Sequence, residues 1–123
     1  KAAGETLLAE VRTLLDGQSF NRALETIWAV ISEANVDIDA QAPWTLKKTD
    51  PERMAAVLYT VVETVRRIAL ILQPVMPEST EKLLDLLAQS ADQRGFDALN
   101  SRLEAGSELP KPAGVFPRFV EAE

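Results

Sequence analysis

Apolar residues recur every three or four positions along most of the chain, which is the period of a helix with one buried face. This pattern predicts a first helix over Glu5–Asp16, and Gly17 is expected to stop it. A second helix is predicted to begin after Ser19, whose side chain can cap it. The apolar stripe of this second helix comprises Phe20, Leu24, Ile27, Ile31, Ala34 and Ile38. The same pattern puts Trp28 among the core positions.

Two more helices are predicted in the second half of the chain. The first covers Pro51–Leu72, because Asp50 is a good cap and proline fits the first helical position. The second opens at Pro77 and directs Leu83, Leu84 and Leu87 to the core. A polar turn and one short helical turn over Phe96–Leu99 follow.

The chain shows no strand pattern, and its last part is rich in proline. We therefore expect an all-α fold, an antiparallel helical bundle over residues 1–107. Residues 108–123 are expected to form an extended tail that packs on the bundle, with Val115 and Phe116 as its anchors.

Composition excludes several kinds of chemistry. The 123 residues include no cysteine and no histidine, which excludes disulfides, thiolate or imidazole metal sites and histidine-dependent catalysis. No residue is predicted to be catalytic or to bind a metal ion. The longest apolar region, Met54–Leu72, carries Glu63, Arg66 and Arg67, which a membrane span would not tolerate. No targeting segment is recognised, and a cytoplasmic protein is expected.

The net charge of −6 argues against a protein that binds nucleic acid without regard to sequence, and DNA is not an expected partner. The charge is unevenly spread, however. Residues 41–67 contain five cations and three anions, so this segment carries +2 and the remainder carries −8. The net-positive segment begins where the second helix is expected to end.

The segment Ala40–Lys48 is predicted to be a break between helices, and it contains Trp44 directly after Pro43. One interpretation is that Trp44 plugs the end of the bundle. The other is that its ring is a platform on which an unpaired base stacks, with Pro43 stiffening the backbone. Lys47 and Lys48 would then hold nearby phosphates. Composition alone favours plugging.

Polar residues on the helices before and after this break are further candidates. Asn35 and Asp39 are four positions apart and share one helix face, where they can bond the helix end or read base edges. Arg66 and Arg67 follow Glu63 at helical spacing, so local ion pairs are the simpler interpretation and an RNA-backbone contact the other.

Three segments together resemble a known family: Ala34–Lys48, Arg53–Pro77 and Gly114–Arg118. In the same order, they are similar to parts of the anticodon-binding domain of methionyl-tRNA synthetases, which are class I aminoacyl-tRNA synthetases. The likeness covers most of the chain. It implies that Trp44 stacks on the cytosine at the first anticodon position and that Pro43 fixes the ring. Asn35 and Asp39 would lie beside the anticodon pocket.

The resemblance also has departures. The family usually has an aromatic residue where this chain has Asp37, which adds a negative charge near the RNA. In the family, the bundle begins with a helix that carries an asparagine and an arginine, and that helix would precede Lys1. We therefore expect a C-terminal piece of an ATP-dependent methionine–tRNA ligase, in which ATP and methionine bind a catalytic domain outside this chain.

The expected partners are thus a methionine-accepting tRNA and the catalytic domain of the same polypeptide, with no cofactor in this chain and no membrane contact. The alternative from another class is a helical module for protein interaction or self-association, which would bind a partner helix or a second copy through an apolar groove.

Overall fold

The computed structural model describes residues 3–121, and side chains from Thr6 onward. Residues 1–2 of the predicted range 1–107, and residues 122–123 of the predicted range 108–123, lie outside the described part. The described chain contains helices and irregular segments, with no strand, as the sequence predicts. The chain divides into two compact units, and the division falls after Ile68. It does not coincide with the predicted boundary at residue 107.

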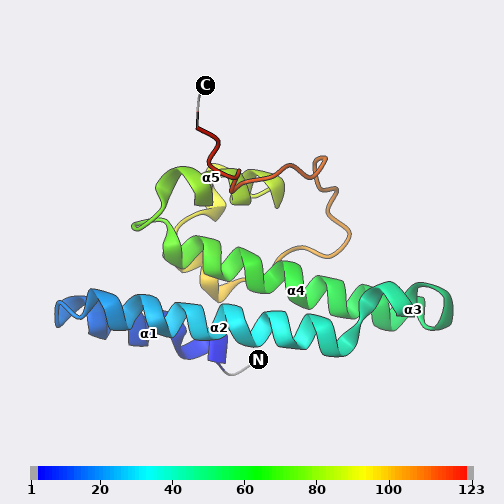
Figure 1. Cartoon of the computed structure of the whole chain (residues 1–123), viewed down its shortest axis with the longest axis horizontal. Coiled ribbons are helices and arrows are strands. Elements are labelled where there is room, and N and C mark those ends of the chain that lie inside the picture. Colours follow the sequence, from blue (N-terminus) through cyan, green and yellow to red (C-terminus); the bar gives the residue numbers. More distant parts are fainter. Residues whose placement is uncertain (1–2, 122–123) are drawn as a thin grey trace. The chain divides into compact units, whose positions relative to one another are not determined.

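Unit 1 begins with a pair of antiparallel helices, α1 (Ala3–Asp16) and α2 (Phe20–Gln41), which pack against each other (Figure 1). Their buried side chains come from the predicted stripes: Leu7, Val11, Ala23 and Ile27. The short helix α3 (Pro43–Thr49) follows, and α4 (Pro51–Leu72) then returns in the opposite direction to α2 (Figure 1). The bounds of α4 are those that the sequence predicts.

The turn between α1 and α2 differs from the prediction. The helix ends at Asp16, but the left-handed residue that ends it is Gln18, with φ 57°, and not Gly17. The N–H of Gln18 bonds the Leu15 carbonyl at 2.9 Å, and the N–H of Ser19 bonds the Leu14 carbonyl at 2.8 Å. These two bonds form a Schellman motif. The predicted capping by Ser19 is wrong, because its side chain makes no capping hydrogen bond.

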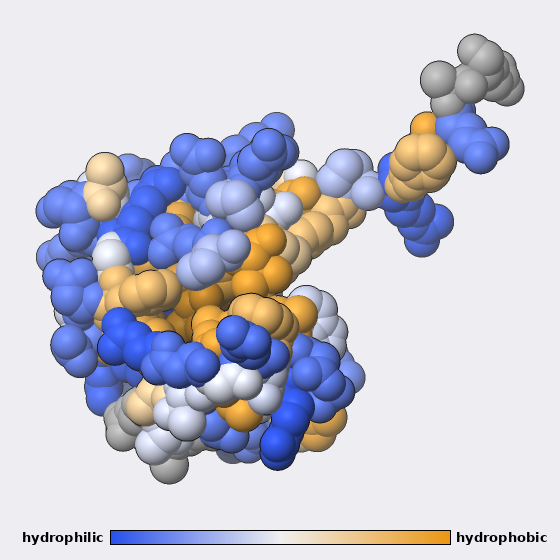
Figure 2. Space-filling model, turned by 90° about the vertical axis from the view of Figure 1, so that its left-hand side faces the viewer, coloured by the Kyte–Doolittle hydropathy of each residue, from blue (hydrophilic) through white to orange (hydrophobic). Residues whose placement is uncertain are grey.

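The prediction for Trp28 is also wrong, because this side chain is 51% exposed. Trp28 follows the buried Ile27 and therefore points about 100° away from it around the helix axis. Phe20, the first residue of the predicted stripe, is 60% exposed. Figure 2 views the molecule from the end at which α1 and α2 meet, and both hydrophilic and hydrophobic residues are visible from that side.

Unit 2 continues α4 from Ala69 and adds α5 (Pro77–Leu86) and two short 3-10 helices, η1 (Ala91–Gln93) and η2 (Phe96–Asn100). Its core joins α4, α5 and η2 through Ala69, Leu70, Leu83, Leu84, Ala98 and Leu99. Arg94 connects η1 to α5, since its guanidinium donates to the Gln89 carbonyl and to Asp85. The predicted opening of a helix at Pro77 and the short helical turn at Phe96 are both confirmed.

The tail after η2 is extended, as predicted. Val115 is half-buried, whereas Phe116 is 63% exposed and Phe119 is 88% exposed. Anchoring of the tail through Phe116 therefore has no support from its burial. The packing of residues 108–123 on the bundle stays a prediction.

Candidate nucleic-acid interface

The segment that was expected to be an irregular break is a helix with a sharp turn in front of it. Only Ala42 separates α2 from α3, and it adopts the left-handed conformation, with φ 42° and ψ 60°. Its N–H donates to the Ile38 carbonyl at 2.9 Å, which ends α2. Pro43 then begins α3, because its fixed φ suits the first helical position and its missing N–H costs nothing there.

Trp44 lies in the first turn of α3, and 62% of its surface is exposed. Pro43, directly before it, is buried and fixes the backbone from which the indole projects. The plugging interpretation, which composition favoured, is therefore wrong for this chain. An exposed ring on a stiff backbone meets the requirement for stacking on a planar ligand.

Two cations accompany the indole. Lys47 and Lys48 are three and four positions after Trp44, so they lie on its side of α3. Both are exposed, and both lie in the last turn of the helix, where the helix dipole favours positive charge. One short helix thus presents an open aromatic ring and two ammonium groups on one side.

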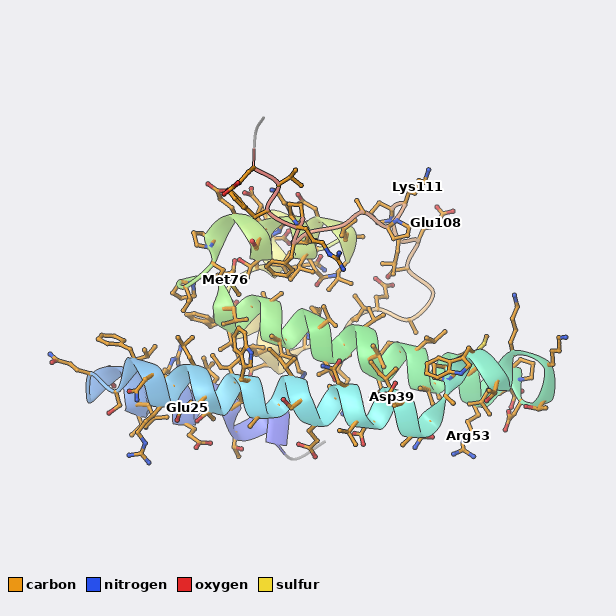
Figure 3. The ribbon with its side chains drawn as sticks, viewed as in Figure 1. Glu25, Asp39, Arg53, Met76, Glu108 and Lys111 are labelled. Carbon is orange, nitrogen blue, oxygen red and sulfur yellow. The ribbon has the colours of Figure 1, made fainter. Side chains whose placement is uncertain are left out.

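Asn35 and Asp39 form a second group, on the last turns of α2 before the turn at Ala42. Both side chains are exposed, and their spacing places them on one face of the helix, as predicted. Asp39 can be found on α2 in Figure 3. The candidate residues therefore divide into two groups, one on each of two consecutive helices.

A contact that the sequence reasoning missed joins the helices on either side of α3. Nη2 of Arg53, in the first turn of α4, donates to Oε1 of Gln41, the last residue of α2, at 2.9 Å. The backbone N–H of Arg53 donates to Oδ1 of Asp50 at 3.0 Å, which confirms Asp50 as the cap of α4. No periodicity relates residues 41 and 53, so pattern analysis could not find the pair.

Arg66 and Arg67 do not contribute open cations to this interface. Their Nε atoms both lie 2.8 Å from the carboxylate of Glu63, so the simpler interpretation, local ion pairs, is confirmed. Arg66 is only 1% exposed. The RNA-backbone interpretation of Arg66 is therefore wrong.

Other kinds of site find no support in the described residues. Residues 3–121 contain no group of three or more histidine, cysteine, aspartate or glutamate side chains that could hold a metal ion. No helix within this range is long and apolar enough to cross a membrane.

Comparison with solved structures defines the class of this fold. The chain superposes on the apo form of Mycobacterium tuberculosis methionyl-tRNA synthetase with a TM-score of 0.93 and 45% sequence identity, over 98% of this chain and 25% of that one. The same enzyme in complex with methionyl-adenylate matches with a TM-score of 0.91 and 46% identity, over 95% of this chain and 24% of that one. The fold is thus that of a helical domain within a class I synthetase structure.

The family follows from sequence. The model of the anticodon-binding domain of methionyl-tRNA ligase matches residues 2–123, and the chain belongs to this family. Methionine–tRNA ligase of Mycobacterium leprae (strain TN) is 51% identical over 121 residues, which are 95% of this chain and 22% of that protein. The enzyme of Brucella melitensis biotype 1 is 48% identical over 120 residues, which are 97% of this chain and 23% of that protein. The chain thus spans under a quarter of the length of these relatives.

Proposed function

We propose that this chain recognises the anticodon of a methionine-accepting tRNA as one domain of an ATP-dependent methionine–tRNA ligase. In this proposal, the domain supplies binding energy and specificity, while ATP and methionine bind a catalytic domain elsewhere in the same polypeptide. Single-stranded loops suit this role because their base edges are open to side chains. Family membership supports anticodon binding as the function, and the exposed surface of α3 supports the contacts with individual bases and phosphates.

The central step is the stacking of one anticodon base on Trp44. The observation that carries it is the 62% exposure of this indole on a helix that begins with a buried proline. The ring loses little freedom on binding because its backbone is already fixed. Lys47 and Lys48 supply the adjacent positive charge that a phosphate backbone requires. Asn35 and Asp39 offer an amide that can pair with base edges and a carboxylate that can reject unsuitable ones.

The test is Trp44→Ala in the full-length enzyme. The substitution is expected to weaken the selection of methionine tRNA by about 1–3 kcal/mol, because one stacked base is lost. The measured quantity is kcat/KM for tRNA aminoacylation, while amino-acid activation without tRNA should hardly change. Trp28→Ala is a matched control, since it removes a second exposed indole that lies on α2. Equal losses in the two variants, or no loss at Trp44, would contradict the platform.

The alternative function, a module for protein interaction or self-association, stays a prediction. The exposed apolar side chains of Phe20 and Trp28 on α2 are the observation that favours it. Salt separates the two functions: RNA binding should fall steeply as salt concentration rises, whereas association through apolar surfaces should not.

A further inference from the structure

The orientation of Trp44 depends on how α3 is held. This helix has seven residues, which is too short for a helix to be stable by itself in water. Both of its ends are sharp turns, at Ala42 with φ 42° and at Asp50 with φ −151°. A left-handed conformation is unfavourable for alanine, so the turn before α3 needs support from its surroundings.

The contact between Gln41 and Arg53 supplies such support, because it bridges α3 from one side to the other. Gln41 is the residue before the first turn, and Arg53 lies three positions after the second. Their side chains meet at 2.9 Å, closing a loop of the chain that contains all of α3. We call this pair the α2–α4 clasp.

Arg53 is itself held at two points, which makes it a suitable anchor. Its backbone N–H donates to Oδ1 of Asp50 at 3.0 Å, and its guanidinium reaches back to Gln41. The first turn of α4 is therefore tied at once to the end of α3 and to the end of α2. These two hydrogen bonds oppose a reorientation of α3 relative to the helices on either side of it.

We infer that Gln41 and Arg53 are positioning residues for anticodon binding, which act by holding α3 so that the indole of Trp44 faces the RNA. The inference rests on the proposed function. It assigns neither residue to a base or phosphate contact: they act through the geometry of α3. Loss of the clasp should let α3 reorient, so that the enzyme spends part of its time with Trp44 misdirected.

The experiment compares Gln41→Ala, Arg53→Ala and the double variant in the full-length enzyme. Each single variant is expected to raise KM for tRNA by about 3–10-fold, with kcat and amino-acid activation unchanged, because population of the competent orientation falls by that factor. The double variant should be no worse than either single one, since the two residues form one contact. Arg22→Ala, at an exposed arginine on α2, controls for the loss of a positive charge.

A second measurement reports on α3 without RNA. In a Trp28→Phe background, Trp44 is the sole tryptophan of this chain, and its fluorescence anisotropy can be followed in this chain free of RNA. Gln41→Ala should lower this anisotropy if the clasp restrains α3. An unchanged anisotropy and an unchanged KM would overturn the inference.

The outcomes also separate this inference from the proposed function. If Trp44→Ala raises KM but Gln41→Ala does not, the platform stands and the clasp has no positioning role. Arg53→Ala alone could raise KM and also make the slope of log K against log salt concentration shallower by the amount of one phosphate contact. In that case Arg53 binds phosphate directly, and the inference is overturned. If Trp44→Ala leaves KM unchanged, the platform fails, and the role of the clasp in RNA binding fails with it.

Discussion

The guanidinium of Arg66 holds both carboxylate oxygens of Glu63, with Nε 2.8 Å from Oε2 and Nη2 2.9 Å from Oε1. Nε of Arg67 reaches the same carboxylate at 2.8 Å. Glu63 and Arg66 are both buried within α4. Burying a charge costs free energy unless an opposite charge compensates it, so each of these two residues offsets part of the cost of burying the other.

We therefore predict that Glu63→Ala destabilises the fold by about 3–5 kcal/mol, because it removes the carboxylate that accepts two hydrogen bonds from the buried guanidinium of Arg66. The measurement is urea denaturation followed by circular dichroism. Asp85→Ala is the matched control, since it also removes a carboxylate paired with an arginine, but the Asp85 side chain is 62% exposed. Its expected cost is about 0–1 kcal/mol. Similar losses at the two positions would contradict this account.

A second prediction concerns the turn after α1. Gln18→Gly is expected to stabilise the protein by about 0.5–1 kcal/mol, because glycine adopts the left-handed conformation without the strain that glutamine accepts at φ 57°. The shift of the denaturation midpoint measures the gain. Gly17→Ala provides the comparison: its Cβ would meet the Thr13 carbonyl oxygen at an ordinary 3.5 Å, so a change below about 0.5 kcal/mol is expected. A large loss at Gly17 would show that Gly17 holds the turn.

The helices themselves could be predicted from the sequence because their end signals are local. Asp50 and Pro51 mark the beginning of α4, and Pro77 marks the beginning of α5, each through its own side chain or its fixed φ. The class of fold follows from these signals and from the apolar period. The exposure of Trp44 was expected only from the family resemblance, because composition favoured burial.

Other features were not predicted, because the spacing of residues along a helix does not show how far each side chain is covered by its surroundings. Periodicity placed Trp28 in the core, but it follows a buried residue and points away from it. Helical spacing predicted the ion pairs of Arg66 and Arg67 with Glu63, but it gave no sign that Arg66 is buried. The short helix α3 was missed because its proline was interpreted as ending a helix, and here it also begins one.

A third prediction concerns acid. Ser90 donates a hydrogen bond from Oγ to Oδ1 of Asp92 at 2.6 Å, and this bond, with a backbone hydrogen bond, holds the pKa of Asp92 below its ordinary value of 3.8. A carboxyl group whose pKa is lowered by folding contributes stability at pH values above its unfolded pKa. That contribution is lost as the pH falls below 3.8 and through the folded pKa.

Ser90→Ala should therefore raise the pKa of Asp92 toward 3.8, because the largest cause of the shift is removed. Titration of the Asp92 carboxyl carbon by NMR measures this directly. An unaltered Asp92 titration in the variant would show that the Ser90 hydroxyl does not hold the carboxylate.

The last prediction concerns Lys47 and Lys48, which we propose as phosphate contacts. Each contact with a single-stranded phosphate releases counterions and adds about 0.7 to the slope of log K against log salt concentration. The double variant Lys47→Ala/Lys48→Ala should therefore make this slope shallower by about 1.4 for tRNA binding to the full-length enzyme. The matched control is Lys82→Ala/Lys111→Ala, which removes two exposed lysines from unit 2. We expect the control to retain the full slope. Equal changes in the two double variants would mean that only net charge matters and that α3 presents no phosphate site.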